Sequence, residues 1–103
     1  MRVLRFIVNG QTLDKQAGDF DGLVAGTAGY LQARFAFNAD WSACKKVASF
    51  YDALDREYAA PIIDNMCEIP PEALAYGIFS VRVTGDRSGY RIRTNKVFIQ
   101  QEV

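Results

Sequence analysis

Among the side chains of this sequence that could perform chemistry, three carboxylates stand close together. Asp52, Asp55 and Glu57 lie within the stretch DALDRE. Two carboxylates are enough for glycoside hydrolysis, in which one protonates the leaving group and the other acts as nucleophile or base. Acids in a polar turn between two strands are normally solvated, however, and nothing in this stretch indicates the raised pKa that a general acid needs.

Acid–base catalysis elsewhere in the chain lacks its commonest participant, because the sequence contains no histidine. Histidine is the usual general base near neutral pH. Without it, the serines and the two cysteines have no imidazole to activate them. We therefore predict that the protein is not an enzyme.

The segment DFDGLVAGTAGY begins like a calcium-binding loop. Asp19 and Asp21 occupy its first and third positions, but Leu23 stands at the fifth and Tyr30 at the twelfth, where another acid and a bidentate glutamate are required. The glycines are not followed by the lysine and hydroxyl residue of a phosphate-binding loop. Two cysteines without a histidine do not form a structural zinc site either. We expect no metal and no cofactor, and we interpret residues 16–29 as a solvated connector.

Charge is unevenly distributed, although the 12 basic and 12 acidic residues balance. Residues 82–96 hold five basic side chains against Asp86 alone, a net charge of +4, and residues 52–72 hold six acids against Arg56, a net charge of −5. These segments are either two solvated strand faces or complementary docking surfaces of a subunit that assembles with copies of itself or with neighbouring proteins. The candidate interaction surface consists of Arg82, Arg87, Arg91, Arg93, Lys96, Asp52, Asp55 and Glu57.

Other kinds of partner are disfavoured by composition. The net charge is zero and the pI is near 6.2, which argues against a nucleic-acid partner. No apolar run approaches the roughly 18 residues that span a bilayer, so we expect no membrane contact. The N-terminal MRVLRFIVNG alternates like a strand, and we expect no secretory signal peptide.

Four aromatic side chains could line a platform for carbohydrate. They are Trp41, Tyr30, Tyr51 and Tyr58. Aromatic residues within alternating strands lie in the core more often than on a binding surface. We therefore interpret Trp41 first as a plug in the core, with its indole N–H bonded to a backbone acceptor, and second as a ligand contact.

The whole chain, residues 1–103, is expected to form a single domain with ample apolar material for one core. Alternating apolar segments separated by turn signals at intervals of roughly 8–12 residues favour an all-β, immunoglobulin-like antiparallel sandwich of about seven or eight strands. One short helix is expected near residues 71–75. Cys44 and Cys67 are expected to be reduced and half-buried.

Local patterns place the individual elements. Asn9-Gly10 predicts a tight primed hairpin turn, and Pro61 predicts a strand at a sheet edge or an irregularity in a strand. Within the connector, Phe20, Leu23 and Val24 are candidates to reach the core. The predicted core comprises Leu4, Phe6, Leu31, Phe35, Phe37, Trp41, Ala48, Phe50, Ile69, Leu74, Phe79, Val81, Val83, Ile92, Val97 and Ile99.

Four stretches occur in an order that suggests a family: FAFNADWSACKKVASF, CEIPPEAL, GIFSVRVTGD and YRIRTNKVFI, which follow the upstream stretch GDFDGLVAGTAGYLQARF. Together they resemble the N-terminal domain of upper baseplate or tail-fibre proteins from phages and prophages of Gram-positive bacteria. The core residues that carry this resemblance are Phe35, Phe37, Trp41, Phe50, Pro70 and Phe79.

The resemblance implies a non-enzymatic structural protein of a phage tail or baseplate. Its partners would be other tail or baseplate subunits, or further copies of itself. It would be found in the virion, or in the bacterial cytoplasm as a prophage product. A carbohydrate- or host-surface-binding module is the alternative function.

Overall fold

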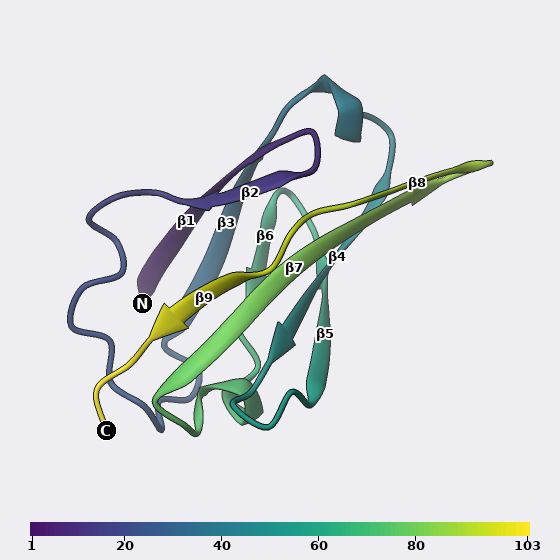
Figure 1. Cartoon of the computed structure of the whole chain (residues 1–103). Helices are drawn as coiled ribbons and strands as arrows, with labels where there is room; N and C mark the ends of the chain where they lie inside the picture. The colour runs from purple at the N-terminus through teal and green to yellow at the C-terminus, as the bar shows by residue number, and fades with distance from the viewer.

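A computed structural model describes residues 1–103 and shows two β-sheets packed face to face (Figure 1). The four-stranded sheet has the order β2-β1-β3-β6, with β1 Arg2–Asn9, β2 Thr12–Lys15, β3 Leu31–Phe37 and β6 Met66–Glu68. The five-stranded sheet has the order β5-β4-β7-β8, and β9 also pairs with β7. Its strands are β4 Lys45–Tyr51, β5 Glu57–Ile62, β7 Ile78–Arg87, β8 Tyr90–Arg93 and β9 Val97–Gln100. The predicted all-β sandwich is confirmed.

The structure has nine strands where the sequence predicted about seven or eight. Strands β8 and β9 both pair with β7, at its two ends, and are separated by residues 94–96. Short 3₁₀ turns at Ala39–Trp41 and Pro71–Leu74 are the only helical elements, and the second coincides with the predicted helix. Figure 1 shows the β7–β8 hairpin projecting well beyond the rest of the sandwich.

One strand pair departs from the predicted antiparallel arrangement. Strands β1 and β3 are parallel, with Arg2 opposite Leu31 and Val8 opposite Phe37. The connector of residues 16–29 carries the chain back to the level at which β1 began, so β3 starts beside the start of β1. A parallel pair needs such a long crossover.

The turn between β1 and β2 lies one residue later than predicted. Asn9 pairs with Thr12, so the two loop residues are Gly10 and Gln11. Gly10 has a φ of +58°, whereas Asn9 and Gln11 do not have positive φ. A positive φ at the first loop residue alone is typical of a type II′ turn, for which glycine is preferred.

The core lies between the two sheets and agrees closely with the predicted set. All predicted core residues are buried except Phe37 and Val97, which are half-buried against the core. The predicted core set did not include several members, listed here together: Val8, Leu13, Ala33, Cys44, Ile62, Cys67 and Ala73. Pro61 lies in β5, which is an edge strand, one of the two predicted alternatives.

The connector contributes two of its three candidate residues to the core. Leu23 is buried, and Phe20 packs edge-on against Phe6 with ring centroids 5.3 Å apart. Val24 is 53% exposed, so that part of the prediction is wrong. Its backbone is extended beside Glu102, which accepts from the Ala25 N–H and donates to the Leu23 carbonyl. Neighbouring residues of an extended segment point to opposite sides, and Leu23 takes the inner one.

Trp41 occupies the corner between β3 and β4 and is fully buried. Its Nε1–H donates to the carbonyl oxygen of Gly10 at 2.8 Å, and its ring lies 5.2 Å from that of Phe37. The interpretation of Trp41 as a core plug with a backbone acceptor is confirmed.

Candidate interaction surface

The predicted interaction surface lies largely on one face of the five-stranded sheet. Phe50 and Val81 are paired core residues, so their neighbours Tyr51 and Ser80 point to the opposite, outer face. The same alternation along β5, β7 and β8 places Glu57, Arg82, Arg91 and Arg93 on this outer face. Lys96 joins them, because its Nζ lies 3.8 Å from the centroid of the Tyr51 ring. Asp55 joins through an ion pair with Lys96 at 2.9 Å.

Two of the predicted surface residues lie elsewhere. Arg87 points to the inner side of the hairpin, where its guanidinium stacks 4.0 Å from the Tyr90 ring centroid and donates to the Ser42 carbonyl at 3.1 Å. Asp52 is buried at the end of β4. Asp52 is therefore not available to a partner, whereas Arg87 is exposed and in no ion pair but lies away from the outer face.

Charges on the outer face are largely satisfied within the chain. Asp86 pairs with Arg91 at 2.7 Å, Asp55 pairs with Lys96, and Arg82 Nε donates to the Thr94 carbonyl at 3.1 Å. Exposed pairs of this kind contribute roughly 0–1 kcal/mol to stability. Arg93 and Glu57 form no ion pair, and the strand order places them at opposite edges of the sheet. The outer face therefore has an unpaired cation, Arg93, at its β8 edge and an unpaired anion, Glu57, at its β5 edge. Lys45 of β4 and Arg82 of β7 lie between these edges on the same face and belong to no ion pair either.

Asp52 has the opposite of the environment that a catalytic acid needs. Burial of the carboxylate opposes its ionisation, but its oxygens accept from the N–H groups of Leu54 and Arg56 and from Arg56 Nε, at 2.9, 3.0 and 2.8 Å. These bonds and the guanidinium charge outweigh burial and lower the pKa of Asp52. Asp52 is therefore a structural anion that orders the loop between β4 and β5.

The lowered pKa of Asp52 predicts a loss of stability in acid that depends on this residue. The unfolded chain has an Asp pKa of about 3.9, and the folded value is lower. The stabilising contribution is thus complete above about pH 5 and is lost as the pH falls through the folded value. Urea denaturation at a series of pH values measures the free energy of unfolding. Between neutral and acidic pH, this free energy should fall less steeply for Asp52→Asn, and also for Arg56→Gln, than for the unmodified chain. An unchanged fall in Asp52→Asn would contradict this assignment.

The other chemical candidates are also occupied or isolated. Asp19, the first residue of the possible calcium loop, accepts from the backbone N–H, Nε and Nη2 of Arg5 at 2.9–3.0 Å, which lowers its pKa. No group of three or more His, Cys, Asp or Glu side chains is placed to hold a metal ion. Cys44 and Cys67 are buried and unpaired, and burial raises the pKa of Cys67 to about 12.

No helix is long and apolar enough to cross a membrane.

The four aromatic residues considered for a carbohydrate platform do not form one. Trp41 and Tyr51 are buried, and Tyr58 is half-buried against the core. Only Tyr30 is well exposed, at 51%. It lines a hollow of about 290 Å³ together with Arg2 and connector residues, and sequence reasoning missed this hollow. Nothing in the periodicity of the chain indicated it, because it depends on how the connector folds back beside the start of β1.

The fold and the surface together define a β-sandwich whose outer face carries opposite unpaired charges at its two edges. Comparison with protein-family models finds no match, and comparisons with curated proteins and with solved structures find none either.

Proposed function

We propose that this protein is a non-enzymatic structural subunit that assembles through the outer face of the five-stranded sheet. The observation that carries the proposal is the placement of unpaired Arg93 and unpaired Glu57 at opposite edges of one face. Opposite charges arranged in this way are self-complementary, because a two-fold axis can bring Arg93 of one copy against Glu57 of the other. Electrostatic complementarity of this kind supplies register and specificity.

The surface between these charges suits a protein contact. At its centre, Ala59 and Thr84 are small, Val47 is exposed, and Ser49 and Ser80 are buried beneath their neighbours. Phe98 lies on the same face, opposite Ser80, and is 59% exposed. An exposed aromatic side chain within a polar rim is the usual anchor of an interface.

Charge reversal tests the proposal. Sedimentation of the intact chain at low salt should show self-association that weakens as salt is added. Arg93→Glu and Glu57→Arg should each weaken it by about tenfold, and the double reversal should restore it. Arg34→Glu makes the same charge change on the outer face of the other sheet and is the matched control. A monomer at every concentration and salt level, or a double variant that fails to recover, would overturn assembly through this face.

The specific form of the proposal is a tail or baseplate component of a phage or prophage, found in the virion or in the host cytoplasm. It is supported by the resemblance carried by the segments around Phe35, Trp41, Phe50, Pro70 and Phe79. The neighbouring genes give the most direct test. Tail or baseplate genes on both sides would support this role, and a metabolic operon would contradict it.

A further inference from the structure

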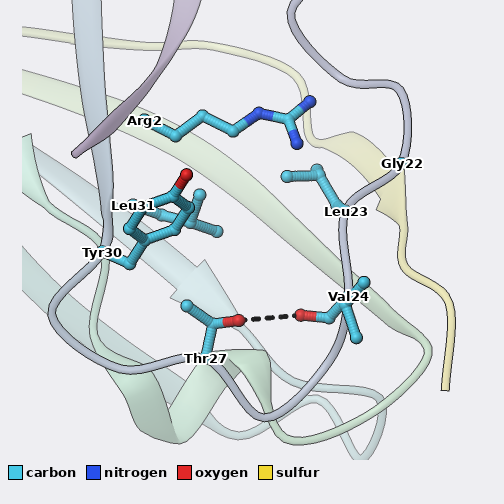
Figure 2. Close-up of a pocket in the computed structure, with 7 residues that line it drawn as sticks. All are labelled: Arg2, Gly22, Leu23, Val24, Thr27, Tyr30 and Leu31. Atoms are coloured by element: carbon cyan, nitrogen blue, oxygen red, sulfur yellow. Dashed lines mark hydrogen bonds between the residues drawn. The ribbon is translucent and has the colours of Figure 1, made fainter.

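The hollow beside Tyr30 has the shape and chemistry of a small-ligand site. It lies between the connector and the starts of β1 and β3, and seven residues line it: Arg2, Gly22, Leu23, Val24, Thr27, Tyr30 and Leu31. Figure 2 shows Tyr30 and Leu31 facing Leu23 and Val24 across the hollow, with Arg2 above and Thr27 below. Its volume of about 290 Å³ is close to the lower end of the roughly 300–1,000 Å³ range of small-molecule pockets. It suits a single ring-sized group better than an extended chain.

The polar side of the hollow is cationic. Arg2 Nη2 donates to the main-chain carbonyls of Asp19, at 2.9 Å, and Asp21. Its hydrogen-bond partners are therefore neutral, and Arg2 belongs to none of the four ion pairs of the chain. The carboxylate of Asp19 is near enough for the Arg2 charge to help lower its pKa, but it is already paired with Arg5. No lining residue is acidic. Arg2 Nη2 donates to both carbonyls, which holds the guanidinium in place, and Nε and Nη1 have no partner in the chain. Because both bidentate faces of a guanidinium include Nη2, a carboxylate at Arg2 accepts one charge-assisted bond, from Nε or from Nη1.

The other walls suit a ring with one apolar face and several hydroxyl groups. The half-exposed Tyr30 ring offers a flat apolar surface, and buried Leu23 and Leu31 close the apolar side. The Thr27 hydroxyl donates to the Val24 carbonyl at 3.0 Å, so its oxygen lone pairs remain free to accept from a ligand hydroxyl. An aromatic body with a polar tip, as in tyrosine, is well suited to an amphipathic ligand.

We propose that this hollow binds one unit of an acidic saccharide, a sugar ring whose carboxylate pairs with Arg2. The apolar face of the ring lies on Tyr30, and a ring hydroxyl donates to the Thr27 oxygen. A neutral sugar leaves the Arg2 charge unpaired, and a simple carboxylate leaves the Tyr30 surface uncovered. Both parts of the ligand are therefore required. The site is separate from the outer face of the five-stranded sheet and does not depend on assembly.

Titration of the ¹⁵N-labelled chain with glucuronate tests the proposal. Saturable amide shifts should be confined to residue 2 and residues 22–31, with a dissociation constant on the order of 1 mM. Glucose and acetate, used as separate probes, should each bind at least about tenfold more weakly. Absence of saturable shifts at these residues, or glucose or acetate binding as tightly as glucuronate, would overturn the proposal on the unmodified chain.

Substitutions at Arg2 and Tyr30 test the two ligand contacts separately. Arg2→Gln should weaken glucuronate binding by at least about tenfold and remove the preference over glucose. Tyr30→Leu should weaken binding without unfolding the chain, because Tyr30 is half-exposed. Arg34→Gln removes an exposed arginine from β3 outside the hollow and should bind as the unmodified chain does. If Arg2→Gln and Tyr30→Leu both bind glucuronate normally, the site is wrong. Because Arg93 and Glu57 are not involved, failure here would leave the assembly proposal unaffected.

Discussion

Replacement of Trp41 with alanine is expected to lower the free energy of unfolding by about 3–5 kcal/mol, because it removes the largest fully buried side chain of the core. The indole lies between Phe37 and the backbone of β7, and its N–H is the hydrogen-bond partner of the Gly10 carbonyl. Deleting it leaves both a cavity and an unpaired acceptor. Urea denaturation followed by far-ultraviolet circular dichroism measures the change, since the chain has no other tryptophan to report by fluorescence.

Trp41→Phe separates the two contributions. The phenyl ring fills part of the space but cannot donate to Gly10, so an intermediate loss of stability is expected. In the unmodified chain, Trp41 emission should be blue-shifted and should not respond to added saccharides, because the ring is inaccessible to them. A loss of less than about 1 kcal/mol in Trp41→Ala would mean that the ring is exposed in solution.

The parts of the fold that sequence reasoning predicted well are those determined by local alternation. Phe35 and Phe37 share a strand face because side chains repeat every two residues in a strand, and the same rule separates Val81 and Val83 from Arg82. Pro61 marked an edge strand because proline cannot donate to a β-ladder. The Trp41 corner was predictable for a different reason, since a large amphipathic ring next to a turn is best satisfied when the ring is buried and the N–H is bonded.

Features that depend on distant segments could not be predicted in this way. Whether Asp55 is free or paired depends on Lys96, which is 41 residues away in sequence. The parallel pairing of β1 and β3 depends on the path of the connector, whose glycines have no period. Alternation alone indicated that Arg82, Arg91 and Arg93 share one face of the sheet. Only the strand order shows that Glu57, in β5, lies at the edge opposite to β8.

The two candidate sites also differ in how far local sequence determines them. The outer face was partly predictable, because its residues come from segments of strong charge bias. Arg87 and Asp52 belonged to the same segments, yet one turns to the inner side of the hairpin and the other is buried by its own loop. The hollow beside Tyr30 was not predictable, because Arg2 and Thr27 meet there only through the folding of the connector.

Gly85→Ala is the second substitution expected to have a large effect. Gly85 is buried within β7, and a methyl group there would lie 2.7 and 2.8 Å from two carbons of the Trp41 ring and 3.2 Å from Cβ of Cys44. A glycine inside a strand often marks such a close approach. The ring cannot move away without losing its bond to Gly10, so a loss of about 3 kcal/mol is expected, at the upper end of overpacking costs. Gly77→Ala is the matched control, because its methyl group would meet no atom closer than 3.6 Å, and it should change stability by less than about 0.5 kcal/mol.

A double-mutant cycle shows whether the Gly85 effect acts through the Trp41 ring. In the Trp41→Ala background the added methyl group has space, so Gly85→Ala should cost less than about 1 kcal/mol there, a coupling of about 2 kcal/mol. If Gly85→Ala costs the same in both backgrounds, the contact with Trp41 is not the cause. A strong coupling would instead mean that the indole and the bare backbone of β7 fit together as one unit. Glycine at position 85 would then be required for the same reason as tryptophan at position 41, since neither side of the contact tolerates a change of size while the other is present.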